Sequence, residues 1–192
     1  MKIKHYILPI VLSMFSLSAC VPVLLVAAGA TLGGAVVYDK RSVTTMAEDR
    51  DAASRLLKQI SEEPELKSQT HIIISTFNHV LLLAGQATTE EQRNRVYQMA
   101  SSVPHLKRIY NEITIEPPTS GSVQAEDSWI TTKVKSKMLA EKGLSSTEIK
   151  VVTENSVVYL MGLVTHKQAD LAATVASSVS GVSKVVRIFE YE

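Results

Sequence analysis

One stretch of the sequence occurs twice, and this repeat limits what the chain can fold into. Residues 78–103 read NHVLLLAGQATTEEQRNRVYQMASSV, and residues 155–179 read NSVVYLMGLVTHKQADLAATVASSV. The copies are 77 residues apart at Gly85 and Gly162, and 76 residues apart at the shared ASSV. A repeat of this period predicts two small domains of the same fold. Each would hold roughly 65 to 70 residues, enough to fold alone with a small stability margin.

The first domain, residues 48–115, reads as helix, strand, strand, helix and strand. The expected elements lie at 48–60, 71–76, 80–83, from Thr88 or Thr89 to Val103, and at 109–115. Apolar residues at helical spacing indicate the first helix, and β-branched residues indicate the hairpin strands. Pro64 and Pro104 are expected to end the two helices.

The second domain, residues 127–192, follows a short linker at 116–126 and repeats this order. Asp127 or Ser128 would cap its first helix, and Thr165 its second. The hairpin strands and the last strand are expected at 149–153, 157–162 and 184–191. Gly85 and Gly162 have structural roles, each closing a strand at a bulge or a close backbone approach. We therefore expect an α+β fold with helices packed on a small three-stranded sheet in each domain.

The amino terminus has the features of a secretory signal over residues 1–19. Lys2 and Lys4 precede an apolar run that ends in Leu-Ser-Ala-Cys at Cys20. This ending resembles the bacterial lipobox, which implies that Cys20, the only cysteine, carries lipid. Val21 after it favours the outer membrane, with residues 20–47 as a tether and the domains facing the periplasm. A transmembrane helix is the alternative, because no charged residue lies between Lys4 and Asp39.

Charge and motifs argue against several functional classes. Without Lys2 and Lys4 the chain keeps 18 of its 20 basic side chains against 19 acidic ones, so it lacks the basic surplus of a nucleic-acid binder. The histidines show no metal-ligand spacing; they are His5, His71, His79, His105 and His166. The sequence also has no phosphate loop, nucleophile elbow or zinc-protease motif. We expect no enzyme activity, cofactor, metal or small-molecule substrate.

The strand ends carry a family resemblance. Residues 158–162, VYLMG, fit a Val-x-Leu-x-Gly pattern, and residues 81–85, LLLAG, fit it loosely. Residues 181–185, GVSKV, match the approach to a last strand, from which residues 102–106 depart. With the order of elements, these residues resemble BON domains, and the chain resembles outer-membrane lipoproteins with two of them. The resemblance implies phospholipid binding and a role in envelope integrity, with the division site as a candidate location.

The first helix of the second domain is the candidate binding element. At 100° per residue, Ile130, Val134 and Met138 share one arc and should face the core. The phospholipid-binding candidates share another arc: Trp129, Lys133, Ser136, Lys137 and Ala140. A tryptophan suits the headgroup level of a membrane, and lysines attract anionic lipid. The alternative is that Trp129 packs against the first domain or the linker, beside lysines on an ordinary solvated face.

A second functional class stays open at this point. The exposed edge strands of two small sheets could each add a strand from a partner. The chain would then be a structural or adaptor protein that binds envelope proteins or peptidoglycan. Binding to anionic phospholipid vesicles would separate the two interpretations.

Overall fold

The computed structural model describes residues 39–192. The expected signal peptide at 1–19, the expected lipidation site Cys20 and most of the expected tether at 20–47 lie outside the described residues. Within residues 39–192, no helix has the length and apolar character that crossing a bilayer requires. Residues 36–192 form one compact unit, which holds both repeats.

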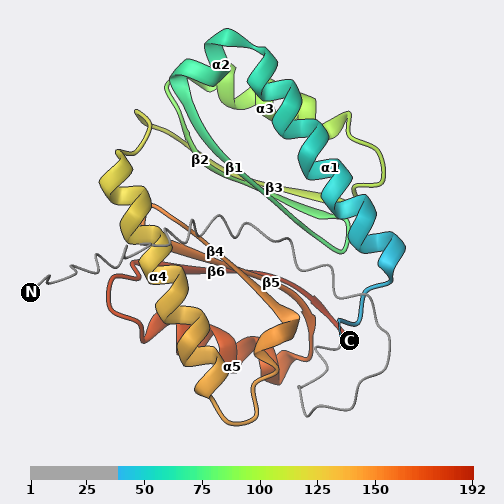
Figure 1. Cartoon of the computed structure of the whole chain (residues 1–192), viewed down its shortest axis with the longest axis vertical. Helices are drawn as coiled ribbons and strands as arrows, with labels where there is room; N and C mark the ends of the chain where they lie inside the picture. The colour runs from blue at the N-terminus through green and yellow to red at the C-terminus, as the bar shows by residue number, and fades with distance from the viewer. Residues whose placement is uncertain (1–38) are drawn as a thin grey trace, which may run out of the picture. The chain divides into compact units, whose positions relative to one another are not determined.

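Each repeat forms a three-stranded sheet with helices (Figure 1). The first contains α1 (Val43–Glu62), α2 (Pro64–Gln69), β1 (Thr70–Phe77), β2 (Val80–Ala87), α3 (Glu90–Ser101) and β3 (Arg108–Ile115). The second contains α4 (Gly121–Ala140), the 3-10 turn η1 (Ser146–Glu148), β4 (Ile149–Glu154), β5 (Val157–Val164), α5 (His166–Ser177) and β6 (Lys184–Tyr191). The expected α+β class is confirmed, with α2 and η1 as additions.

The two sheets have the same topology. Strand order is β1-β2-β3 in one and β4-β5-β6 in the other, so the second strand of each repeat is central. The first two strands pair antiparallel through a tight hairpin. The third lies parallel to the central strand, because α3 or α5 carries the chain back across the sheet.

Several helix ends differ from expectation. α4 begins at Gly121 with Ser120 as its N-cap residue, so the predicted cap at Asp127 or Ser128 is wrong. Both of those residues lie inside the helix, which starts within the expected linker. The cap at Thr165 is confirmed, since its hydroxyl accepts a hydrogen bond from the Gln168 amide at 3.3 Å.

The two matching glycines lie inside the central strands rather than at their ends. β2 runs two residues beyond Gly85, and β5 runs two beyond Gly162, in a register with no bulge. A Cβ at Gly85 would lie 2.0 Å from the backbone oxygen of His71, at a φ of +114°. A Cβ at Gly162 would lie 2.7 Å from the oxygen of Glu148. The predicted close approach is therefore present, whereas the strand end and the bulge are not.

Three apolar clusters hold the unit together. One lies between α1, α3 and the first sheet, and a second between α4, α5 and the second sheet. The third joins the opposite faces of the two sheets: Phe77, Val80, Leu82, Ala84, Tyr159, Met161 and Ile188. Because both faces of β2 are covered, all of its residues are buried. Figure 1 accordingly shows the sheets between the helices of the two repeats.

Candidate functional site

α4 presents one face to the core and another to solvent. Ile130, Val134 and Met138 are buried in the cluster beneath it, as the helical spacing predicts. Trp129 lies beside them along the chain but is 62% exposed. The indole is therefore not enclosed by the first repeat or by the residues before α4. An exposed tryptophan of this kind is available for contact with a partner or a membrane.

The two lysines of the predicted site are held against the protein. Lys133 donates to the backbone oxygen of Ser180 at 2.5 Å, and Lys137 donates to that of Ser178 at 3.1 Å. These oxygens follow the carboxyl end of α5, where helix carbonyl groups attract positive charge. The ammonium groups are thus fixed on one flank of the face that carries Trp129. Ser136 and Ala140, the other predicted residues, are exposed on α4.

Leu139 belongs to this surface, although sequence reasoning did not select it. Its side chain is 74% exposed. Ten residues separate it from Trp129, which places it about 80° around the helix and about 15 Å along the axis. Thr132 and Ser136 are exposed between them. Helical spacing could have identified Leu139, because positions i, i+3, i+7 and i+10 counted from Trp129 lie along one side of a helix. We call Trp129, Thr132, Ser136 and Leu139 the α4 stripe.

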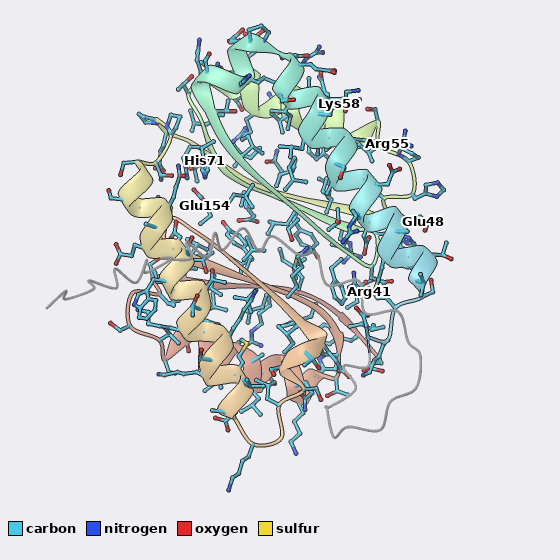
Figure 2. All side chains as sticks on the ribbon, viewed as in Figure 1. Arg41, Glu48, Arg55, Lys58, His71 and Glu154 are labelled. Atoms are coloured by element: carbon cyan, nitrogen blue, oxygen red, sulfur yellow. The ribbon has the colours of Figure 1, made fainter. Side chains whose placement is uncertain are left out.

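The first repeat has no equivalent surface. The helical spacing had matched Trp129, Lys133 and Lys137 with Ala52, Arg55 and Gln59, but the shared aspartates Asp49 and Asp127 align Trp129 with Asp51 instead. Ala52 is buried, and Arg55 pairs with Asp51 at 2.6 Å. Figure 2 shows Arg55 and Lys58 on the outer side of this helix. Leu57 is 56% exposed there, but no aromatic side chain accompanies it on α1. The two repeats therefore share a fold but differ in the chemistry of the first helix.

A buried aspartate fixes each first helix to its hairpin. Asp127 in α4 accepts hydrogen bonds from the amides of Asn155 at 2.7 Å and Ser156 at 2.8 Å. Both turn residues have positive φ, which leaves their amides without strand partners. Because Trp129 follows two residues later, this bond also sets the position of the α4 stripe.

The first repeat contains the same device. Asp49 accepts hydrogen bonds from the amides of Asn78 and His79, each at 2.8 Å. Because Asp49 is polar and lies off the apolar arc of α1, helical spacing alone predicts that it faces solvent; that prediction is wrong, since the residue is only 3% exposed. Arg41 also bonds this carboxylate, at 2.9 Å.

Polar groups border the contact between the two sheets. His71 of β1 lies 3.5 Å from the carboxylate of Glu154, and Gln86 donates to that carboxylate at 2.7 Å (Figure 2). Burial, and then the nearby carboxylates of Glu112 and Glu154, raise the pKa of Tyr159 to about 12. These groups link the repeats, and none belongs to the α4 surface.

A cavity of about 710 Å³ lies between α2 and α3. Its walls are mostly acidic and amide side chains, including Glu63, Glu65, Glu90 and Glu91. Glu63 is paired with Arg95 at 2.8 Å, and the buried Gln92 donates to Glu65 at 3.0 Å. Among residues 39–192, no three His, Cys, Asp or Glu side chains are grouped to hold a metal ion. These contacts do not indicate a catalytic site in the cavity.

Comparison with known proteins gives the chain's relatives. It is 32% identical to the outer membrane lipoprotein DolP of Haemophilus influenzae, over 85% of this chain and 84% of that protein. It is 37% identical to a 21 kDa hemolysin of Actinobacillus pleuropneumoniae, over 80% and 79%. It is 27% identical to the osmotically-inducible protein Y of Escherichia coli, over 80% and 77%.

The family comparison covers both repeats. The BON domain matches residues 48–117 and again residues 126–192. Each match spans the helix, hairpin, helix and strand described above. The chain belongs to the BON domain family and carries two such domains in tandem.

Proposed function

We propose that this chain is a non-enzymatic outer-membrane lipoprotein that binds anionic phospholipid through α4 and supports envelope integrity. A similar relative bears the name outer membrane lipoprotein, which supports a place in the envelope. Attachment through Cys20, a periplasmic orientation and a role at the division site are parts of the proposal. The binding surface is the α4 stripe together with Lys133, Lys137 and Ala140.

The observation that carries the proposal is the pair of large apolar side chains on the α4 stripe. Trp129 is 62% exposed and Leu139 is 74% exposed, while the opposite face of α4 is anchored in the core. A helix of this kind can lie in the plane of a membrane interface with its outer side chains inserted. The small side chains of Thr132 and Ser136 between the two anchors do not hinder that approach.

The flanking lysines account for the preference for anionic lipid. Lys133 and Lys137 are fixed on one side of the stripe by the oxygens after α5. Each lysine near an anionic surface contributes about 1 kcal/mol, so two of them favour anionic over zwitterionic lipid by about 2 kcal/mol. Weak binding suffices for a domain that a lipid anchor already holds near the membrane, because its effective concentration is high.

The test uses Trp129 as its own reporter, since it is the only tryptophan in the chain. The protein is residues 36–192, which form a compact unit. It is titrated with phosphatidylcholine vesicles, with and without phosphatidylglycerol, while the emission wavelength is followed. We expect a blue shift with the anionic vesicles, because the indole moves from water into the interface.

A matched pair of leucine variants locates the surface. Leu139→Glu and Leu57→Glu each place a carboxylate at an exposed leucine of a 20-residue helix. Leu139→Glu should abolish the shift, whereas Leu57→Glu should leave it unchanged. Equal effects of the two, or no shift in the parent protein, would reject the proposal. Capture of envelope proteins without vesicle binding would favour the adaptor function instead.

A further inference from the structure

A second charged pocket lies where the chain enters the first repeat, and its residue Lys135 adjoins the α4 stripe beside Ser136 and Leu139. It has a volume of about 320 Å³ and is bordered by residues 39–41, by Lys135 of α4 and by residues 147–150. Phe77 and Leu163 complete its wall. Cavities of roughly this size bind small ligands or headgroups. We call it the entry pocket.

Cationic residues outnumber acidic ones in the lining of the pocket. Four cationic residues line it, Lys40, Arg41, Lys135 and Lys150, against two acidic ones, Asp39 and Glu148. Part of this charge is neutralised within the protein. Lys40 pairs with Glu148 at 3.1 Å and also with Glu192, and Arg41 pairs with Asp39 at 2.7 Å and with Asp49 at 2.9 Å.

Lys135 and Lys150 are left without carboxylates. Within residues 39–192, neither forms an ion pair; Lys150 donates to the backbone oxygen of Thr76 at 3.0 Å. Lys150 as a whole residue is exposed, whereas its ammonium group is held at the Thr76 oxygen. Desolvation of this group, and then the charge of Arg41, lower the pKa of Lys150; Asp49 opposes this shift, and Lys135 adds to it. Arg41 and Lys135 are therefore near enough to Lys150 to disfavour its charge, and an anion beside these groups would relieve the repulsion.

Arg41 gives the pocket a fixed wall. Its guanidinium group lies 4.0 Å above the ring centre of Phe77, in addition to its two carboxylate partners. An arginine held in this way loses little freedom when a further ligand binds. Lys135 and Lys150 supply further donors in the lining, and each ammonium group has three N–H bonds. The arrangement suits a compact, multiply charged oxyanion.

We propose that the entry pocket binds the phosphate group of a small anion or a lipid headgroup, with Lys135 and Lys150 as its main ligands. This site shares no residue with the α4 stripe, although Lys135 adjoins it, and the inference does not depend on the proposed function. Free phosphate and a glycerophosphate headgroup share the chemistry that the pocket recognises, so experiment must distinguish these sources.

The test is an NMR titration of the ¹⁵N-labelled full chain in uncharged detergent micelles. Inorganic phosphate and glycerol 3-phosphate are added in turn, with sodium chloride at equal ionic strength as the reference. We expect saturable shifts at the amides of residues 39–41 and 147–150. Tighter binding of glycerol 3-phosphate would identify a lipid headgroup as the source, and tighter binding of inorganic phosphate the free ion. Shifts that do not saturate, or that lie elsewhere, would overturn the proposal.

Two charge-matched variants complete the test. Lys135→Gln with Lys150→Gln should weaken phosphate binding about tenfold or more. Lys67→Gln with Lys167→Gln removes the same charge from exposed sites and should change the affinity less than about twofold. Lys135→Gln alone breaks no hydrogen bond or ion pair within residues 39–192 and should weaken binding by itself. An equal loss in the two double variants would refute a defined site. Trp129→Glu should leave phosphate binding intact, which separates this inference from the proposed function.

Discussion

The carboxylate of Asp127 lies 2.7 Å from the backbone nitrogen of Asn155, and 2.8 Å separates Asp49 from Asn78 at the same place in the first repeat. Each aspartate sits in the first helix of its repeat and bonds a turn 28 or 29 residues later. Both carboxylates are nearly inaccessible to solvent. These bonds fasten the helix to the hairpin, so the loss of one should be measurable as a loss of stability.

Asp127→Asn should lower the free energy of unfolding by about 2 kcal/mol. The amide group keeps one oxygen acceptor, so one buried turn N–H loses its partner. Urea denaturation measures the change. Asp51→Asn is the control, because Asp51 is exposed in α1 and forms a surface ion pair with Arg55; its effect should be below about 0.5 kcal/mol. Equal effects of the two would show that the buried bonds do not stabilise the fold.

Gly85→Ala should destabilise the protein by at least about 3 kcal/mol. The added Cβ meets the His71 oxygen, and the φ of +114° strains a side-chain-bearing residue. Gly121→Ala serves as the comparison, since nothing lies within 4 Å of a Cβ at that position. Thermal unfolding should show a lower Tm for the first variant only. A tolerated alanine at Gly85 would contradict the close approach of β1 and β2.

Tyr159 should make stability fall in alkaline solution. Its pKa is raised to about 12 by burial and by Glu112 and Glu154, against an ordinary value of 10.0. The folded state holds the phenolic proton more tightly, so this contribution is complete below pH 10 and is lost between about pH 10 and 12, amounting to about 2–3 kcal/mol.

Denaturation curves across that range should therefore differ between the parent and Tyr159→Phe. The variant should lose less stability from pH 10 to 12, because it has no proton to release. Tyr191→Phe is the matched control, as Tyr191 is 47% exposed. Parallel curves for parent and Tyr159→Phe would mean that the phenol ionises as easily in the folded as in the unfolded chain.

The lysines beside the α4 stripe should give membrane binding its dependence on salt. Lys133→Gln with Lys137→Gln should weaken binding to phosphatidylglycerol vesicles about tenfold or more and flatten its response to added sodium chloride. Binding to pure phosphatidylcholine should change little, because Trp129 and Leu139 remain. Sedimentation with vesicles measures both. An unaltered salt response would assign the charge effect to other residues.

Much of the fold can be predicted from the spacing of residues in the sequence. The features that could not be predicted depend on contacts between residues far apart in the chain. The burial of Ile130, Val134 and Met138 was predictable, because residues three or four apart lie on the same face of a helix. The roles of Asp49 and Asp127 were not, since their partners are backbone amides of a turn that only the folded chain brings near. Sequence offers no separate sign for a carboxylate bonded in this way.

The candidate surface was found only in part for a similar reason. Trp129 was selected because it is an aromatic residue next to lysines. The predicted set therefore extended along the helix face that carries Lys133 and Lys137. In the structure those lysines turn toward the oxygens after α5, and the apolar surface extends the other way, to Leu139. The entry pocket combines residues 39–41 with β4 and α4, and no spacing along the chain connects these segments.

The cluster of Phe77, Leu82, Tyr159 and Ile188 between the sheets has a consequence for how such a chain can evolve. A protein reduced to either repeat would expose one whole side of its middle strand to water and invite self-association. Duplication therefore contributes to stability as well as providing a second domain. Each repeat covers an apolar sheet face of the other. Because that face is already covered, the exposed side of a first helix such as α4 can change its residues without loss of the interface.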